Sequence, residues 1–188
     1  MIRCANRPGR ILDLTSVQLK LPETSFPDEL PGMSLLNKSS VSHSDQVLYE
    51  TSQKIATITL NRPEKLNAMS RSLLNDLEAA FERAKGDSSV KVVLLKGSGR
   101  SFCAGYDLAP DDWILTQYGA DFEGPVNAVQ DREDVTEILE YWLRLWKFPK
   151  PIIAEVQGAC LSGAGELLAM ADLVVASENA RFGHPAGR

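Results

Sequence analysis

Long apolar runs, histidine and paired cysteine are all scarce in this 188-residue chain, and each shortage excludes a class of protein. No stretch approaches the ~20 apolar residues that a transmembrane helix needs, so we expect no membrane span. The cysteines, Cys4, Cys103 and Cys160, are odd in number and lack CxxC spacing, which indicates free thiols in a reducing compartment. The only histidines, His43 and His184, belong to no His/Cys cluster, so we expect no metal site.

A block of one charge sign is also missing. The chain carries 20 basic and 25 acidic residues, which are interspersed and sum to a net charge of −5. Because nucleic-acid-binding domains concentrate basic residues on one face, we expect no nucleic-acid partner. With 44% hydrophobic and 24% charged residues, the composition is that of a globular protein, and the length suits one domain with or without a tail.

Residues 1–45 differ in character from the rest of the chain. They contain four prolines, the serine-rich stretch NKSSVSHS and little periodicity, which predicts a flexible N-terminal arm ahead of a folded domain over 46–188. The opening MIRCANRPGR has three arginines before the first acidic residue, as organelle transit peptides do. The alternative is a leader without function, with Met33 as the true start.

From about residue 47 the sequence alternates between strand and helix patterns. KIATITL alternates and is β-branched, which predicts a strand, and SRSLLNDLEAAFERAKGD has helical spacing with Ser70 as a plausible N-cap. VKVVLLKG, PIIAEVQG and DLVVAS predict further strands, the first of them buried on both faces of a parallel sheet. Two more helices are predicted over about 131–147 and 163–171. This alternation predicts an α/β fold built from βαβ crossovers.

The predicted helix over 131–147 has an apolar stripe. Its members share one face and are expected to contact the core: Ile138, Leu139, Trp142 and Trp146.

A glycine-rich segment, GACLSGAGELLAMADLVVA over 158–176, precedes the last predicted strand. Three known glycine motifs fail in it. A dinucleotide motif would need glycine at Leu168, and a phosphate loop would need Lys and Ser/Thr at Ala164 and Gly165. A nucleophile elbow would need glycine on both sides of Ser162 at a spacing of two, which the segment lacks.

What remains is a helix start with an unpaired backbone donor. The N–H of Gly163 and the carboxylate of Glu166, three residues later, would lie on one side of the first turn. Such a pair suits chemistry beside a carbonyl, where the N–H stabilises an enolate and the carboxylate moves a proton. The alternative is that small residues only allow close helix–sheet packing. SFCAGYDL, which turns at Ala104–Gly105 after another strand, offers a second donor.

Three segments taken together, TLNRPEKLNAM, FCAGYDL and KPIIAEVQGACLSGAGELLAMADLVVASENARFGHP, resemble the crotonase superfamily of enoyl-CoA hydratases and isomerases. The resemblance runs in order from about residue 47 to the end. It implies a crotonase-like spiral of ββα units assembled into homotrimers or hexamers. It implies an acyl-CoA thioester as substrate, with coenzyme A as part of that substrate and no further cofactor.

The resemblance also assigns roles to single residues. The thioester oxygen would lie between the N–H groups of Ala104 and Gly163, and Glu166 would be the first of two catalytic glutamates. The remaining coenzyme A contacts are implied at Lys65, Ala68, Gly105, Tyr106, Asp107 and Leu108. Lys65 and Arg62 either add positive charge near the phosphates or are solvated surface cations. Tyr106 is alternatively a packing residue, and Trp142 and Trp146 are expected in the core.

The chain departs from the family at its C-terminal end. The second glutamate position holds Ala186, and His184 nearby is either a titrating group or an ordinary surface or core histidine. Family members continue past Arg188 into helices that cover the acyl pocket, so we expect a C-terminally incomplete domain whose C-terminal helices are missing.

The resulting expectation is an enoyl-CoA hydratase in the cytoplasm, or in the mitochondrial matrix or peroxisome of a eukaryote. The alternatives are another crotonase reaction on an acyl-CoA (thioester hydrolysis, dehydration or isomerisation) or a non-catalytic acyl-CoA-binding or assembly subunit. The acyl chain is left undetermined.

Overall fold

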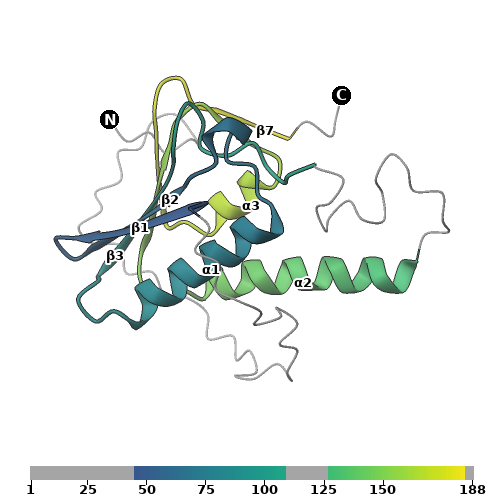
Figure 1. Cartoon of the computed structure of the whole chain (residues 1–188), viewed down its shortest axis with the longest axis horizontal. Helices are drawn as coiled ribbons and strands as arrows, with labels where there is room; N and C mark the ends of the chain where they lie inside the picture. Colours follow the sequence, from purple (N-terminus) through teal and green to yellow (C-terminus); the bar gives the residue numbers. More distant parts are fainter. Residues whose placement is uncertain (1–44, 109–126, 185–188) are drawn as a thin grey trace, which may run out of the picture. The chain divides into compact units, whose positions relative to one another are not determined.

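A mixed five-stranded sheet organises the part of the chain that the computed structural model describes, residues 45–108 and 127–184 (Figure 1). All of these residues belong to one unit, Ser42–Arg188. The predicted arm up to residue 44, the 109–126 part of the irregular stretch and the position of Ala186 lie outside the described residues.

The strand order in the sheet is β1-β2-β3-β4-β6, and β5 and β7 form a separate parallel pair. The strands are β1 (Val47–Ser52), β2 (Ile55–Leu60), β3 (Val92–Gly97), β4 (Ile152–Val156), β5 (Ala159–Leu161), β6 (Leu173–Ala176) and β7 (Arg181–Gly183). The helices are the short 3₁₀ helix η1 (Pro63–Lys65), α1 (Arg71–Gly86), α2 (Ala128–Trp146) and α3 (Ala164–Ala169).

The predicted α/β class is confirmed by the connections between these elements. Strands β2, β3, β4 and β6 are mutually parallel, and helices α1, α2 and α3 lie between them in the sequence, as βαβ crossovers require. The element order also contains two ββα runs, β1-β2-α1 and β4-β5-α3. The four predicted strands form β2, β3, β4 and β6.

The hairpin between β1 and β2 escaped the sequence analysis. The two strands pair antiparallel, and the turn residues Gln53 and Lys54 both have positive φ, at 50° and 71°. Tight hairpins usually place glycine, asparagine or aspartate at such positions. Because neither residue is of these types, the turn carried no local signal.

The sheet is buried mainly on one face, which corrects the expectation for VKVVLLKG. In β3, Val93 and Leu95 are fully buried, whereas Leu94 and Lys96 on the opposite face are partly exposed. β6 is exposed along its whole length among the described residues. Figure 1 shows α1 and α2 on the same side of the sheet, so the described helices cover only one of its faces.

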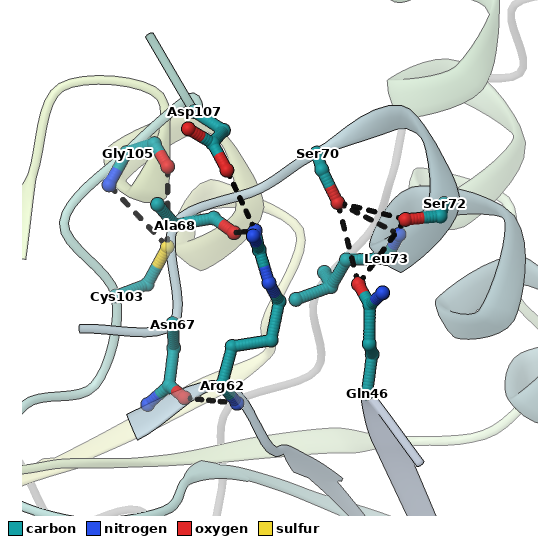
Figure 2. Close-up of polar contacts among 10 residues, drawn as sticks. All are labelled: Gln46, Arg62, Asn67, Ala68, Ser70, Ser72, Leu73, Cys103, Gly105 and Asp107. Atoms are coloured by element: carbon teal, nitrogen blue, oxygen red, sulfur yellow. Dashed lines mark hydrogen bonds and ion pairs between the residues drawn. The ribbon is translucent and has the colours of Figure 1, made fainter. Parts of the chain in front are cut away.

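Helix α1 follows the predicted pattern closely. Ser70 is the N-cap, and its hydroxyl accepts a hydrogen bond from the N–H of Leu73 at 3.2 Å (Figure 2). The six residues with helical spacing are all buried against the sheet: Leu73, Leu74, Leu77, Ala80, Phe81 and Ala84. The helix is therefore stabilised both by its cap and by a continuous apolar face.

Helix α2 buries a different face from the one expected. Trp142 is buried as predicted, together with Tyr141 and Leu145, but Leu139 and Trp146 are 55% and 62% exposed. The hydroxyl of Tyr141 donates to the carbonyl of Leu74 on α1 at 3.1 Å. Contact with α1 therefore buries the face of α2 that carries Tyr141 and Leu145.

None of the described helices is both long and apolar enough to cross a lipid bilayer.

Candidate active site

The loops that follow β3 and β4 run side by side and parallel. The N–H of Cys103 donates to the carbonyl of Ala159 at 3.0 Å, and the N–H of Leu161 donates to the carbonyl of Cys103 at 3.1 Å. Both loops leave the carboxyl ends of adjacent parallel strands, where α/β proteins place their ligand sites. The two donor turns expected from the sequence are thus neighbours in space.

Gly163 stands at the start of α3 as its N-cap residue. Its carbonyl accepts the N–H groups of Glu166 and Leu167 at 3.1 and 3.2 Å, whereas its own N–H donates to no acceptor within 45–108 or 127–184. A Cβ at this position would lie 2.3 Å from Cε2 of Tyr106. Only glycine allows the tyrosine ring to pack this closely against the backbone.

The turn at Gly105 brings the first loop onto the second. Its φ is +102°, in the region that favours glycine. An added Cβ would lie 2.8 Å from the carbonyl oxygen of Leu161 and 2.9 Å from Cβ of Ser162. Gly105 is therefore needed both for its conformation and for its closeness to the glycine segment, which places Tyr106 beside Gly163.

Ala104 does not present an available donor, because its N–H is bonded to the carbonyl of Leu66 at 3.0 Å. The N–H of Gly105 faces Sγ of Cys103 at 3.4 Å, and that of Asp107 donates to Met69 at 2.9 Å. The backbone N–H of this turn that has no acceptor among the described residues is that of Tyr106. The sequence could not reveal this, since Leu66 lies in a separate loop.

The side chain of Tyr106 joins the two loops to α2. Its hydroxyl donates a hydrogen bond to Oε2 of Glu166 on α3 and accepts one from Nε1 of Trp142 at 3.1 Å. Burial, reinforced by the hydrogen bond to Glu166, raises the pKa of Tyr106, so the phenol remains a neutral donor. The packing role that was the alternative for Tyr106 is thus present together with a polar contact to the candidate base.

Arg62 is held by an ion pair with the loop after β3. Its Nη1 lies 2.9 Å from Oδ2 of Asp107 and donates to the carbonyl of Ala68 at 2.7 Å (Figure 2). Both charged side chains are largely buried, at 16% and 13% exposure. Arg62 is therefore not the solvated surface cation of the alternative interpretation, and its described contacts tie two loops together.

Asn67 is a structural anchor that the sequence analysis missed. Its buried side chain donates to the carbonyls of Ser98 and Ser101, both at 2.9 Å, and of Phe102 at 3.1 Å. Its Oδ1 accepts the N–H of Arg62 at 2.8 Å (Figure 2). In the stretch NRPEKLNAM, an asparagine shortly after a proline looks like an ordinary turn residue, and only the burial of its side chain identifies it as an anchor.

The residues implied for coenzyme A binding fall into two adjacent segments. The N–H of Met69 donates to Gly105 at 2.8 Å, which places the stretch from Lys65 to Ala68 beside the stretch from Gly105 to Leu108. Lys65 is exposed at the end of η1, and Leu108 is 73% exposed. The segments are therefore available at one edge of the site.

His184 is exposed and directly follows β7. The carbonyl of the preceding residue, Gly183, accepts the N–H of Ser162 at 2.9 Å, so the end of β7 lies against the glycine segment.

The thiols of Cys103 and Cys160 are buried where the loops after β3 and β4 pair. Burial raises the pKa of Cys103 to about 12 and that of Cys160 to about 11, so neither is a nucleophile at neutral pH. Both are free, as predicted, and Cys4 lies outside the described residues. Across the described ranges, no three His, Cys, Asp or Glu side chains gather as a metal site would require.

Comparison with known families and proteins finds matches over most of the chain. The model of a family described as Enoyl-CoA hydratase/isomerase matches residues 50–188. A probable enoyl-CoA hydratase of Rhizobium meliloti is 36% identical over 141 residues, which cover 75% of this chain and 49% of the relative. The 2,3-dehydroadipyl-CoA hydratase of Escherichia coli is 35% identical, covering 74% and 49%. The chain spans about half the length of these curated relatives.

Solved structures match in the same way. The crystal structure of a probable enoyl-CoA hydratase from Mycobacterium smegmatis shares 40% identity with a TM-score of 0.64, covering 75% of this chain and 52% of that one. One from Mycobacterium thermoresistibile shares 40% identity with a TM-score of 0.64, covering 76% and 53%. These similarities confirm the predicted fold class.

Proposed function

The chain belongs to the enoyl-CoA hydratase/isomerase family, the crotonase superfamily expected from its motifs, and from this we propose that it adds water to the double bond of a 2-enoyl-CoA. The observation that carries the proposal is the position of Glu166, one helical turn after a backbone N–H without an acceptor in the described chain. A carboxylate next to such a donor suits reactions beside a thioester carbonyl.

The oxyanion site in this proposal consists of the N–H groups of Gly163 and Tyr106, because that of Ala104 is already bonded to Leu66. Both would donate to the thioester oxygen, on which negative charge develops as water attacks the β-carbon. Preorganised donors of this kind are worth about 10²–10³ in rate each. The resulting enolate is stabilised until it is protonated.

Glu166 moves the proton in this scheme. Its carboxylate takes a proton from the water as the oxygen–carbon bond forms, and the protonated carboxyl then delivers it to the α-carbon. The atoms of one water molecule are thereby added across the double bond, which gives a 3-hydroxyacyl-CoA. One carboxylate suffices for both transfers, which matters because Ala186 has no side-chain acid.

The adenosine and pantetheine portions of coenzyme A would bind along the two adjacent segments. Backbone groups around Ala68 and from Gly105 to Leu108 would supply most contacts, and exposed Lys65 would face the phosphates. We further propose a homotrimer or hexamer of the whole protein, located in the cytoplasm or, in a eukaryote, in the mitochondrial matrix or peroxisome.

A second candidate function is favoured by Ala186, which stands where the family resemblance places a second glutamate. The same donors and Glu166 would also serve another crotonase reaction on an acyl-CoA, such as thioester hydrolysis, dehydration or isomerisation. A non-catalytic acyl-CoA-binding or assembly subunit would keep the donors without turnover.

The test is product analysis by mass spectrometry after the full chain is incubated with a short 2-enoyl-CoA. Hydration predicts a product heavier by one water molecule, and Glu166→Gln serves as the control that loses it. Free coenzyme A as product would favour hydrolysis. Binding of the thioester without any product would overturn the enzymatic proposal in favour of a binding subunit.

A further inference from the structure

We propose that Tyr106 is a positioning residue whose hydroxyl holds the carboxylate of Glu166 in one orientation, with the indole N–H of Trp142 setting the direction of the phenol proton. The inference deepens the proposed function and rests on it. The loop after β3 would then contribute twice: the backbone N–H of Tyr106 to the oxyanion site, and the hydroxyl of Tyr106 to the position of Glu166.

The direction of both hydrogen bonds follows from the chemistry of the three groups. An indole N–H only donates, so Trp142 must donate to the hydroxyl oxygen of Tyr106, at 3.1 Å. A phenol carries a single proton, which is then available only for another acceptor. That acceptor is Oε2 of Glu166, so the proton points at the carboxylate.

The phenol itself is held rigidly by its surroundings. Its ring packs against the backbone of Gly163, where no side chain would fit. Trp142 is buried and contacts Tyr141 edge-on, with ring centroids 4.9 Å apart, and the hydroxyl of Tyr141 is bonded to Leu74 on α1. The position of the hydroxyl is thus fixed by the core between α1 and α2.

Glu166 needs such a partner because it lies exposed on a helix of six residues. No hydrogen bond within the described ranges reaches its Oε1, so this oxygen is available to water or substrate while Oε2 is held. A carboxylate restrained in this way loses less conformational freedom when it reaches the reacting atoms. Tyr106 therefore acts on the reaction through Glu166.

The other titratable groups around this pair are neutral or paired. Burial raises the pKa of Cys103 to about 12 and raises that of Tyr141 well above its usual range. The charged groups next to Tyr106, Asp107 in its own loop and Arg62 in the loop packed against it, form an ion pair with each other. Removal of the phenol hydroxyl therefore breaks the hydrogen bond to Glu166 without leaving an unpaired charge beside Tyr106.

The first experiment compares the full chain with Tyr106→Phe, which keeps the ring and removes the hydroxyl. Hydration of a short 2-enoyl-CoA should lose about tenfold in kcat with little change in KM, the split expected for a lost positioning contact.

Two further variants separate positioning from a structural effect. Trp142→Phe keeps an aromatic ring but removes the indole donor, and it should lower kcat by a smaller factor than Tyr106→Phe. Tyr49→Phe removes a buried hydroxyl that makes no hydrogen bond among the described residues, so it should leave kcat unchanged. In a Glu166→Gln background, Tyr106→Phe should cause no further loss of rate, since the group it positions is absent.

A spectroscopic measurement that needs no turnover distinguishes failure of this inference from failure of the proposed function. In a protein labelled with ¹³C at glutamate carboxyl carbons, the Glu166 signal is assigned by its loss in Glu166→Gln. Its chemical shift should change in Tyr106→Phe, where the carboxylate loses a hydrogen-bond donor, and should stay unchanged in Tyr49→Phe. An unchanged carboxyl shift in Tyr106→Phe would overturn the positioning role even if hydration is observed, whereas absence of hydration with a changed shift would overturn the proposed reaction alone.

Discussion

The hydroxyl of Tyr106 is bonded to the carboxylate of Glu166, although the two residues are 60 positions apart in the sequence. The contact crosses from the loop after β3 to the first turn of α3 and lies beside the backbone of Gly163. It brings the hydroxyl of a partly buried tyrosine and the candidate base into one arrangement. Each part of that arrangement can be tested separately.

Replacement of Glu166 by glutamine should abolish most of any turnover. Glutamine keeps the size of the side chain but cannot accept and return a proton, so we expect a fall of about 10²–10⁴ in kcat. Affinity for a saturated acyl-CoA, measured by calorimetry, should change little, because backbone groups are proposed to hold the thioester. A mutant with nearly native turnover would show that Glu166 is an ordinary residue of a helix start.

Gly163→Ala should damage the site, whereas Gly165→Ala should not. A Cβ on Gly163 would lie 2.3 Å from the ring of Tyr106, which must move away from Glu166 and Trp142. A Cβ on Gly165, in the same helix, meets nothing within 4 Å. Since alanine favours helix by up to about 1 kcal/mol over glycine, the second variant should be as stable as the native chain or more so.

Thermal unfolding and hydration rates of these two glycine variants decide the matter. Equal loss of activity in both would mean that the helix tolerates no side chain for some reason other than the tyrosine ring.

Asn67→Ala should destabilise the fold strongly. The carbonyl oxygens of Ser98, Ser101 and Phe102 would lose their donor, the last two in buried hydrogen bonds. Each buried loss costs about 1–3 kcal/mol when water cannot replace the donor. Asn61→Ala is the matched control, because the Asn61 amide makes one exposed hydrogen bond to the carbonyl of Asp45. Urea unfolding should show a loss of several kcal/mol for the first variant and under about 1 kcal/mol for the second.

A comparable loss for both asparagine variants would mean that the buried carbonyls of the Asn67 site find water or other partners.

The thiols of Cys103 and Cys160 should be inert while the protein is folded. At pH 8 a thiol of pKa about 12 is thiolate to about one part in 10⁴, and burial also blocks the reagent. In a Cys4→Ser variant, a thiol-specific disulfide reagent should therefore label the chain only at the rate of unfolding. Both thiols should react at once in denaturant. Rapid labelling of the native protein would show that the loops around the site open readily.

Raising the pH acts on these thiols in a predictable direction. Their pKa values are raised in the folded state, so the neutral thiols contribute stability at low pH, which is lost as pH rises past the ordinary thiol pKa of the unfolded chain. The loss should begin above about pH 8.5, the ordinary thiol pKa, and be visible as a lower melting temperature in alkaline buffer. A Cys103→Ala chain should lose less stability over the same pH range.

Local patterns were sufficient to predict the elements that carry the site. The alternation in KIATITL, the helical spacing after Ser70 and the glycine ahead of Glu166 each describe the conformation of their own backbone, and β2, α1 and α3 form there. The parallel pairing of β2, β3, β4 and β6 could also be predicted from the order of the elements, because a helix between two strands allows them to pair in parallel. The extent of the N-terminal arm stays a prediction.

Tertiary structure alone decided which groups of those elements are available. Ala104 loses its donor to Leu66, α2 turns Tyr141 rather than Leu139 toward the core, and Asn67 joins carbonyls from another loop. The hydrogen bond from the hydroxyl of Tyr106 to Glu166 likewise exists only because two distant loops pack together. Periodicity and capping report interactions within a few residues of the chain. The partner of a hydrogen bond, and the buried side of a helix, depend on which distant segments pack together.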